Sequence, residues 1–273
     1  ITGGEKVVLR LLSEKVRQYS LEDLGFAPRE LEIIRGAIDK PHGMILATGP
    51  TGSGKTTTLY AVLKILNRRD INIATIEDPV EYEIEGINQI QVNPRTNLTY
   101  SAGLKSILRQ DPDVIMVGEI RDNETAALCI NAALTGHLVL STLHTNDAGT
   151  TLPRLLDMGI EPFLIGSTVN VVIAQRLVRR ICNSCLQSYM LEGKELDKFK
   201  KQLNLEKILN KKVDQLRLYR GRGCSVCGNK GFRGRTGIYE VMEIDDSLRK
   251  LIGARANASD VKAQALKNGM VPM

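Results

Sequence analysis

A glycine-rich octapeptide carries the clearest chemistry in this sequence. Residues 49–56 read Gly-Pro-Thr-Gly-Ser-Gly-Lys-Thr, the phosphate-loop pattern G-x-x-x-x-G-K-[ST], between segments that read as a strand and a helix. The glycines allow backbone N–H groups to point at phosphate oxygens, Lys55 supplies a positive charge, and the Thr56 hydroxyl is a Mg²⁺ ligand. The pattern predicts ATP and Mg²⁺ as cofactors and ATP hydrolysis as the reaction. The predicted nucleotide-binding residues are Gly49, Pro50, Thr51, Gly52, Ser53, Gly54, Lys55, Thr56 and Thr57.

Two acidic residues bracket the apolar segment 114–117, and their positions separate their predicted roles. Ligands of an open parallel sheet lie beyond the carboxyl ends of its strands. Asp113 and Glu119 are six residues apart, which is roughly 20 Å along an extended chain. Glu119 follows the strand and is predicted to lie near Thr56 and Mg²⁺. Asp113 begins the strand and is predicted to be a structural turn residue.

Two further glutamates follow the predicted strand Ile71–Ile76. Hydrolysis needs a carboxylate that orients or deprotonates the attacking water. Glu77 and Glu81 would reach the same edge of the sheet as the phosphate loop, so both are candidates for this role. Each is equally compatible with an exposed loop position.

His144 ends a predicted strand that begins at His137. A histidine near the γ-phosphate can donate a hydrogen bond to it and so report whether the phosphate is present. A lone histidine is more often structural, but three strand ends converging on one site make a role at the nucleotide equally well supported for His144. His137 begins the strand, and its position alone indicates a structural residue.

Four of the five cysteines form the pairs Cys182-x-x-Cys185 and Cys224-x-x-Cys227, with 38 residues between the pairs. Such pairs in a chain that opens without a signal peptide favour a tetrahedral Zn²⁺ site over disulfides. Four thiolates close the coordination sphere, so the predicted role of the zinc is structural. The long gap predicts an inserted helical hairpin over Leu191–Leu218. Four reduced thiols or two disulfides are the alternatives.

The elements that position these residues read as an alternation of buried strands and helices. Strands that are apolar on both faces, interleaved with helices, predict an α/β fold with a covered parallel sheet. The expected strands are Met44–Thr48, Ile71–Ile76, Val114–Val117 and Leu138–Thr142, with Gly86–Val92 as a hairpin arm. The expected helices are Glu30–Ala37, Lys55–Leu66, Ala102–Gln110, Glu124–Leu134, Thr150–Met158 and Pro162–Ala174.

The two ends of the chain read differently from its centre. Gly4–Leu12 predicts a strand, and Ser20 is a plausible N-cap for a short helix. Gly231–Thr236 predicts a turn and Gly237–Ile244 a strand. Two helices follow, Ser247–Leu251 and Ser259–Lys267, each with serine as the expected N-cap.

The sequence predicts four domains. Residues 1–19 are a remnant of an N-terminal domain with its linker, and residues 20–180 are the nucleotide-binding core. Residues 181–230 are the tetracysteine subdomain, and residues 231–273 are a truncated C-terminal helical region.

Composition limits the function classes. The chain has 273 residues, 42% of them hydrophobic, and a formal charge of +6. No run approaches the roughly 20 apolar residues of a membrane span. Aromatic residues make up only 4%, which argues against a single-strand nucleic-acid binder that stacks bases. The basic charge is compatible with an exposed surface, nucleic acid, or an acidic membrane or protein partner.

Four segments together resemble the secretion ATPase superfamily. They are Gly49–Thr56 (GPTGSGKT), Ile76–Tyr82 (IEDPVEY), Leu108–Arg121 (LRQDPDVIMVGEIR) and Gly136–Thr145 (GHLVLSTLHT). They are similar to the Walker A, Asp, Walker B and His boxes of type II secretion and type IV pilus motors. The resemblance implies a RecA-like P-loop NTPase core, a zinc-binding insertion, a small helical C-terminal region, and a ring hexamer. The four-cysteine insertion resembles the pilus-assembly and type II secretion branch.

The resemblance also implies roles for individual residues. Glu81 would be the catalytic glutamate of the Asp box, and Glu119 would serve Mg²⁺ and its water. His137 and His144 would be the two His-box residues. The resemblance thus implies a functional role for His137 that its position at the start of the strand does not indicate. Arg10 matches an arginine that reaches the nucleotide from an N-terminal domain, most of which is expected to be missing from this chain.

The leading functional hypothesis is a homohexameric motor on the cytoplasmic face of the inner membrane. It would drive an inner-membrane platform protein of a pilus or secretion system, with no nucleic acid involved. A nucleic-acid translocase and a regulatory nucleotide-binding subunit that hydrolyses poorly are the alternatives.

Overall fold

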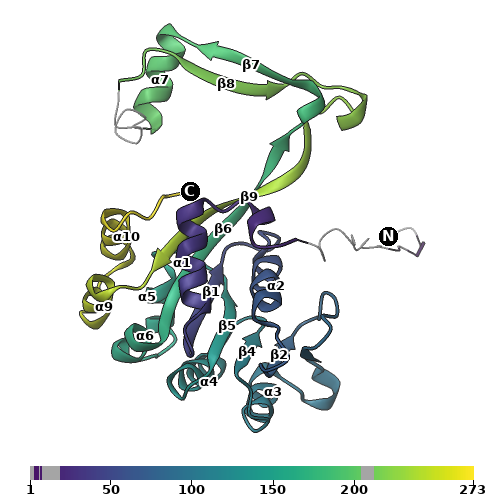
Figure 1. The fold of residues 1–273 in the computed structure, drawn as a ribbon, viewed down its shortest axis with the longest axis vertical. Coiled ribbons are helices and arrows are strands. Elements are labelled where there is room, and N and C mark those ends of the chain that lie inside the picture. The colour runs from purple at the N-terminus through teal and green to yellow at the C-terminus, as the bar shows by residue number, and fades with distance from the viewer. Residues whose placement is uncertain (1–2, 6, 8–18, 204–211) are drawn as a thin grey trace. The chain divides into compact units, whose positions relative to one another are not determined.

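The computed structural model describes residues 3–5, 7, 19–203 and 212–273 (Figure 1). It divides into two compact units. Unit 1 comprises Ile1–Leu177 and Gly237–Met273, and unit 2 comprises Val178–Thr236. Arg10 and most of the predicted strand Gly4–Leu12 lie outside the described residues. Among those described, no helix combines the length and apolar character that crossing a bilayer requires.

The main sheet has seven strands in the order β3-β2-β4-β5-β1-β6-β9. Its central strands pair in parallel: β1 with β5 and β6, β4 with β2 and β5, and β2 with β3. This arrangement confirms the predicted α/β class. The strands are β1 Gly43–Thr48, β2 Ile73–Glu77, β3 Asn88–Gln91, β4 Val114–Val117, β5 Leu138–Leu143, β6 Val169–Ile181 and β9 Phe232–Glu243.

Both faces of the sheet are buried, because side chains of one strand alternate between two hydrophobic clusters. On β1, Met44 and Leu46 join one cluster, while Ile45 and Ala47 join the other. One face is covered by α1 Pro28–Ile38 and α2 Lys55–Leu66. The other is covered by α3 Tyr100–Ile107, α4 Asn123–Leu134, α5 Thr151–Asp157, α6 Pro162–Thr168, α9 Asp246–Gly253 and α10 Ala258–Lys267.

Two predictions that concern the strands of unit 1 are wrong. The predicted helix Pro162–Ala174 ends at Thr168, and β6 begins at Val169. Pairing with β1 places its β-branched residues in the sheet, so tertiary packing overrides the helical pattern. Gly86–Val92 is not a hairpin arm, because β3 within it pairs in parallel with β2.

The C-terminal helices begin at other caps than the predicted serines. Asp245 Oδ1 accepts a hydrogen bond from Leu248 N (2.9 Å), and Asn257 Oδ1 accepts one from Asp260 N (3.0 Å). Both α9 and α10 therefore start before Ser247 and Ser259, since an Asx side chain caps a helix well. Short 3-10 turns are η2 Glu22–Leu24, which follows Ser20 instead of the predicted helix, and η3 Pro94–Thr96.

Unit 2 is built around a two-stranded antiparallel ribbon of β7 Leu186–Leu191 and β8 Leu216–Gly221. Its one helix among the described residues is α7 Gly193–Leu203, so the predicted helical hairpin Leu191–Leu218 is wrong at both ends. Both ends of that range are strands instead, and their pairing gives their backbone N–H and C=O groups hydrogen-bond partners. The turns η4 Asn183–Cys185 and η5 Ser225–Cys227 carry the cysteines, and β9 starts within the predicted turn 231–236.

Candidate functional site

The glycine-rich loop leaves the carboxyl end of β1 and opens α2, as predicted. Gly49 and Gly54 have φ values of +144° and +92°, which residues with a side chain rarely adopt. A Cβ on Gly49 would lie 2.4 Å from the backbone oxygen of Gln175. The loop therefore runs close to β6, and glycine is required at its first position.

Lys55 is folded onto the loop it follows. Its Nζ donates hydrogen bonds to the carbonyl oxygens of Gly49 (2.9 Å) and Pro50 (3.3 Å). Burial lowers the pKa of Lys55, and the negative charge of Glu119 opposes that shift. A buried ammonium group beside a loop of amides is suited to binding a polyphosphate, because the phosphate charge offsets the cost of burying the cation.

A buried hydroxyl in the loop supports this fit to a nucleotide. Ser53 Oγ is the only buried side-chain N or O atom among the described residues that has no hydrogen-bond partner. Leaving such a group unpaired costs about 1–3 kcal/mol. An unpaired polar atom in a phosphate loop is expected where a ligand completes the site.

Gln175 holds the loop from β6, and the sequence analysis missed it. Its Nε2 donates to the carbonyl oxygen of Ser53 (2.9 Å), and its Oε1 accepts from the Thr58 hydroxyl (2.8 Å). The side chain is 1% exposed. It therefore clamps both ends of the turn between loop and helix. The segment just before it, Pro162–Ala174, was predicted to be a helix, so the sequence did not show that Gln175 extends a strand beside Gly49.

Glu119 and His144 meet at the carboxyl edge of the sheet. His144 Nε2 lies 3.2 Å from Glu119 Oε2, while Glu119 Oε1 accepts a hydrogen bond from Arg121. Burial raises the pKa of Glu119, but the hydrogen bonds and charges of Arg121 and His144 outweigh it, so the pKa lies below its usual range. Glu119 is therefore ionised at neutral pH and suited to orient water or a metal ion.

The two glutamates that follow β2 differ in their surroundings. Glu77 is 2% exposed, accepts a hydrogen bond from the Tyr60 hydroxyl, and accepts others from Thr75 (2.7 Å) and Gln89 (3.2 Å). Its carboxylate is thus fully engaged in the core. Glu81 is half-buried, and its backbone N–H donates to Tyr60 Oη (3.4 Å). Of the two, only Glu77 has a carboxylate held by these core hydrogen bonds.

Tyr60 and Arg121 connect these elements, and neither was singled out in the sequence. Tyr60 is fully buried on α2, and its hydroxyl joins the helix of the phosphate loop to the segment that carries Glu81. Arg121 lies between Glu119 and Asp78, with its Nη1 3.9 Å from Asp78 Oδ2. Their roles depend on contacts between distant segments, which sequence spacing does not reveal.

Other predicted residues lie away from this edge. His137 precedes β5 at its amino end, where Nδ1 lies 2.9 Å from the Ala132 carbonyl oxygen. Asp113 Oδ2 accepts a hydrogen bond from Asn72 N (2.6 Å) at the start of β4, the structural position predicted for it. The structure thus brings Glu81, Glu119 and His144 to the loop's edge and leaves His137 at the opposite end of its strand.

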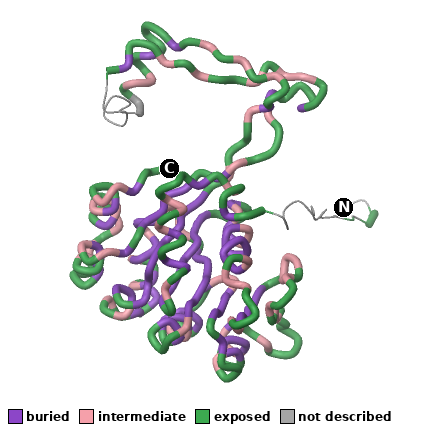
Figure 2. Tube along the Cα trace, viewed as in Figure 1, coloured by how far each residue is buried: buried purple, intermediate pink, exposed green. Residues whose placement is uncertain are grey.

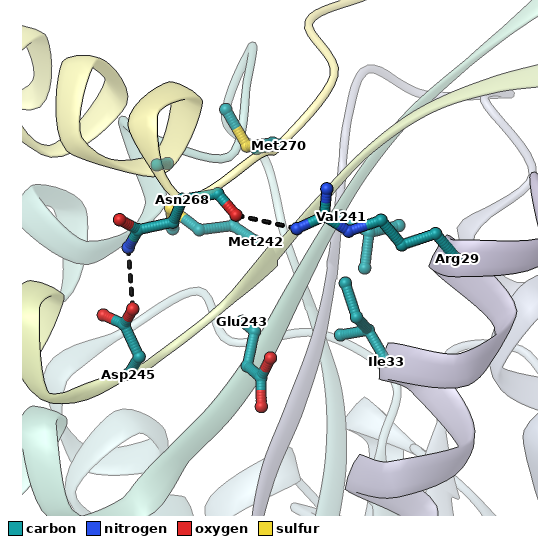
Figure 3. A pocket seen from close by; sticks show the side chains of 9 residues that line it. Arg29, Ile33, Val241, Met242, Glu243, Asp245, Asn268 and Met270 are labelled. Carbon is teal, nitrogen blue, oxygen red and sulfur yellow. Dashed lines mark hydrogen bonds between the residues drawn. The ribbon is translucent and has the colours of Figure 1, made fainter.

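A small pocket between α1, β9 and α10 is a separate feature (Figure 3). Arg29 Nη2 donates to the Asn268 carbonyl oxygen (2.8 Å), and Asn268 Nδ2 donates to Asp245 Oδ2 (2.8 Å). Hydrogen bonds thus join Arg29, Asn268 and Asp245, and the pocket contains no phosphate loop. The other lining residues are Ile33, Val241, Met242, Glu243, Ala265 and Met270.

The four paired cysteines gather within unit 2. Their Sγ atoms all lie within 4.8 Å of one another, with 3.9 Å between Cys182 and Cys224 and between Cys185 and Cys227. Four bonds of about 2.3 Å to a tetrahedral metal ion would place sulfur atoms about 3.8 Å apart. Backbone N–H groups of Cys224 and Gly231 each lie 3.3 Å from Cys227 Sγ and favour a thiolate. The cluster has the composition and spacing of a metal site.

Comparison with known proteins gives one family for nearly the whole chain. The model of the type II/IV secretion system protein family matches residues 1–272. The type II secretion system ATPase E of Vibrio cholerae is 53% identical over 253 residues, which are 93% of this chain and 48% of that protein. The type IV pilus assembly ATPase PilB of Myxococcus xanthus is 49% identical over 268 residues, which are 98% and 46% of the two chains.

A solved structure has a similar fold. The pilus retraction motor PilT with bound ADP superposes with a TM-score of 0.62 at 27% identity, covering 93% of this chain and 65% of that one. This chain spans about half the length of the curated relatives that it matches.

Proposed function

The chain belongs to the type II/IV secretion system protein family, and from that membership we propose that it is an Mg²⁺-dependent ATPase. Its hydrolysis of ATP to ADP and phosphate drives assembly of a type IV pilus or a type II secretion pseudopilus. The observation that carries the proposal is the meeting of Glu119 and His144 at the sheet edge where the loop of Lys55 begins. The names of the relatives and the ADP in the PilT structure support the same substrate.

Each residue at this edge of the sheet has a distinct proposed role in hydrolysis. ATP supplies the scissile phosphoanhydride, and a bound Mg²⁺ would neutralise part of the negative charge of its phosphates. The loop amides and Lys55 hold the phosphates, and Thr56 is the residue of the loop that would ligate Mg²⁺. Glu81 orients the attacking water and accepts its proton, while Glu119 would help to hold the Mg²⁺ and its water. His144, paired with Glu119, responds to the terminal phosphate.

Two residues keep their proposed roles on the resemblance alone. Arg10 lies outside the described residues. His137 contacts the Ala132 carbonyl rather than any residue of the loop's edge. We therefore place the chemistry of hydrolysis on Glu81, Glu119 and His144.

The test is turnover in two carboxylate variants. Glu81→Gln and Glu119→Gln each remove a charge while keeping the size of the side chain. Each should lower kcat by about 10²–10³-fold with ATP affinity retained. Glu83→Gln, an exposed neighbour of Glu81, is the matched control. Wild-type turnover in both variants would refute the assignment of the site.

We propose that the cysteine cluster holds a structural Zn²⁺. Four thiolates fill the coordination sphere, so the ion has no open position for substrate. Purified protein should contain one zinc per chain, and Cys182→Ser combined with Cys224→Ser should remove it. Cys129→Ala changes a buried cysteine outside the cluster and should leave the zinc content unchanged. Protein purified without any bound metal would contradict this assignment.

The working assembly is proposed to be a cytoplasmic homohexamer at the inner face of the membrane, acting on a platform protein of the secretion or pilus system. Unit 2 contains 15 Lys and Arg against 5 Asp and Glu, a formal charge of +10. That charge suits an acidic surface on the membrane side of the machine.

Mass photometry with ATP, which measures the mass of the assembly, tests the proposed hexamer. Hydrolysis stimulated by DNA at modest salt would instead favour the translocase alternative.

A further inference from the structure

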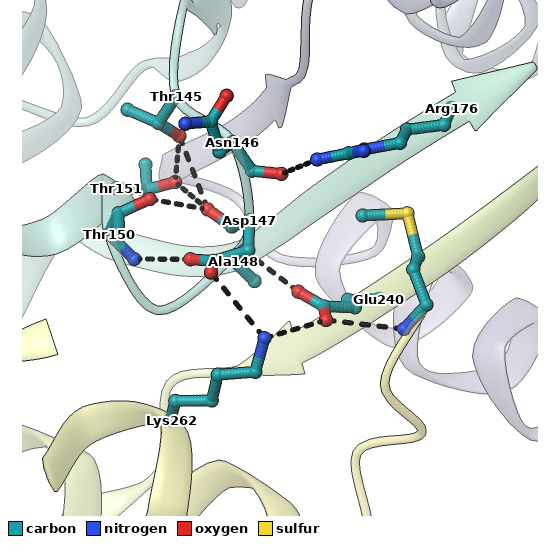
Figure 4. A network of polar contacts seen from close by, with 10 residues as sticks. Thr145, Asn146, Asp147, Ala148, Thr150, Thr151, Arg176, Glu240 and Lys262 are labelled. Carbon is teal, nitrogen blue, oxygen red and sulfur yellow. Dashed lines mark hydrogen bonds and ion pairs between the residues drawn. The ribbon is translucent and has the colours of Figure 1, made fainter. Parts of the chain in front are cut away.

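A polar network ties the loop that follows His144 to the C-terminal helix α10 (Figure 4). The loop, residues 144–150, joins β5 to α5. Lys262 reaches it from α10 and Glu240 from β9, about a hundred residues later in the sequence. Neither residue has a place in the proposed hydrolysis.

Glu240 is a buried carboxylate with three hydrogen-bond donors around it. It is 1% exposed and accepts hydrogen bonds from Ala148 N (3.0 Å), Met273 N (3.2 Å) and Lys262 Nζ (3.2 Å). A buried charge is costly unless it is paired and hydrogen-bonded. The loop residue Ala148 is therefore fixed by a group that itself requires Lys262.

Lys262 holds the loop at a second point. Its Nζ also lies 3.4 Å from Asp147 Oδ2, and Asp147 Oδ1 accepts a hydrogen bond from Thr150 N (2.9 Å). The backbone packs closely as well: a Cβ on Gly149 would lie 3.0 Å from Lys262 Cβ and 3.1 Å from the Ala258 carbonyl oxygen. Charge and shape thus independently place α10 against this loop.

The other end of the loop is joined to the nucleotide site. Thr145, the residue after His144, donates its backbone N–H to the hydroxyl of Thr48 (3.1 Å), the last residue before Gly49. Its own hydroxyl contacts Thr151 Oγ1 (2.9 Å) and the Asp147 carbonyl oxygen (3.2 Å). Displacement of Asp147 would therefore shift Thr145 and, through the adjoining backbone, His144.

We propose that Lys262 and Glu240 are positioning residues for hydrolysis: their ion pair fixes the loop at Asp147 and Ala148 and so sets His144 against Glu119. The inference rests on the proposed ATPase function. It makes α10 and its neighbours part of the catalytic apparatus rather than only a cover for the sheet. It further implies that movement of the C-terminal helices alters turnover without altering nucleotide affinity.

The central experiment compares two lysines on the same helix. Lys262→Met removes the charge that serves Glu240 and Asp147, and exposed Lys267→Met removes the same charge from α10 elsewhere. The Lys262 variant should lose about 10-fold or more in kcat, while the dissociation constant for ATP changes less than about twofold. Lys262→Arg should restore most of the lost turnover, since it restores the charge.

A second measurement needs no nucleotide. Amide exchange in the peptide that spans residues 144–150 should accelerate in Lys262→Met but not in Lys267→Met, because the Ala148 N–H loses an ordered acceptor.

A double variant tests whether Lys262 acts through His144. In a His144→Ala background, Lys262→Met should have little further effect on kcat, since two residues that act through one another are not additive.

The outcomes separate this inference from the proposed function. Wild-type protein without turnover that depends on Lys55 would refute the ATPase itself. An active wild type, with equal kcat for Lys262→Met and Lys267→Met, would overturn the inference alone. Parallel losses of kcat and ATP affinity, without rescue by arginine, would also overturn it and leave the pair as a stabiliser of the fold.

Discussion

Unit 1 encloses its sheet between two layers of helices, and most of its strand residues are buried on both sides (Figure 2). Unit 2 has a two-stranded ribbon and a core cluster built on Leu191, Leu196 and Val213. An isolated ribbon with so little apolar burial is at best marginally stable in water. Apolar burial stabilises unit 1, whereas unit 2 has little of it and contains the cysteine cluster for which we propose a structural Zn²⁺.

The units also differ in charge. Unit 2 carries +10, from 15 basic and 5 acidic residues, while the whole chain carries +6, which leaves −4 for unit 1. The phosphate loop thus belongs to the acidic unit, where Lys55 and the loop amides supply local positive potential. Charge summed over the whole chain describes neither unit, so it is a poor guide to the function of either.

Metal removal should give the largest difference between the units. Structural zinc contributes about 10–16 kcal/mol to the folding of small zinc-finger peptides at neutral pH. Chelation should therefore unfold unit 2 and leave the sheet of unit 1 intact. Amide exchange should show loss of protection in β7 and β8 but not in β1 or β5. Equal protection in both units after the metal is gone would break the comparison.

Lys55→Ala should have the next largest effect, confined to unit 1. Loss of the ammonium group at the phosphates should reduce kcat/KM by about 10³-fold. The unfolding temperature should change little, and metal content should stay the same. Lys250→Ala, which removes an exposed lysine from α9, provides the control for charge. The measurements are ATP turnover, nucleotide binding and thermal unfolding.

Gln175→Leu tests whether unit 1 shapes its loop through β6. Leucine fills the space but leaves the Ser53 carbonyl and the Thr58 hydroxyl without their partner. We expect a destabilisation of about 1–3 kcal/mol and a roughly tenfold loss of ATP affinity. Gln187→Leu, on β7 of unit 2, should leave affinity unchanged. If Gln175→Leu binds ATP as tightly as wild type, the clamp is irrelevant to the nucleotide.

Acid should produce the smallest effect. Burial raises the pKa values of Glu119 and Asp147, but hydrogen bonds and nearby cations outweigh it and lower both. A carboxylate with a lowered folded pKa contributes stability above its unfolded pKa, about 4, and loses it as pH falls through the folded value. Urea unfolding of unit 1 between about pH 3 and pH 7 should show a smaller loss of stability in Asp147→Asn than in wild type. Asp157→Asn, an exposed change on α5, is the control.

The sequence by itself determined the parts whose chemistry depends on local spacing and strand direction. The octapeptide 49–56 specifies its loop because the glycines and the helix that follows them are neighbours in the sequence, so local backbone conformation alone decides the shape of the loop. Strand polarity separated Glu119 from Asp113, since a parallel sheet gathers its carboxyl ends at one edge. The two Cys-x-x-Cys pairs indicated a metal site because each pair is a local turn with two ligands.

Only the tertiary structure decided which residues from distant segments share a site. Gln175 lies next to Gly49 because β6 pairs with β1, whereas the segment before it, Pro162–Ala174, was predicted to be a helix. Strand position alone left Glu77 and Glu81 equivalent, and in the structure Tyr60 and Gln89 engage Glu77. Lys262 and Glu240 meet the loop after His144 through packing across the sheet. Such contacts depend on the summed free energy of the whole core, which no local pattern encodes.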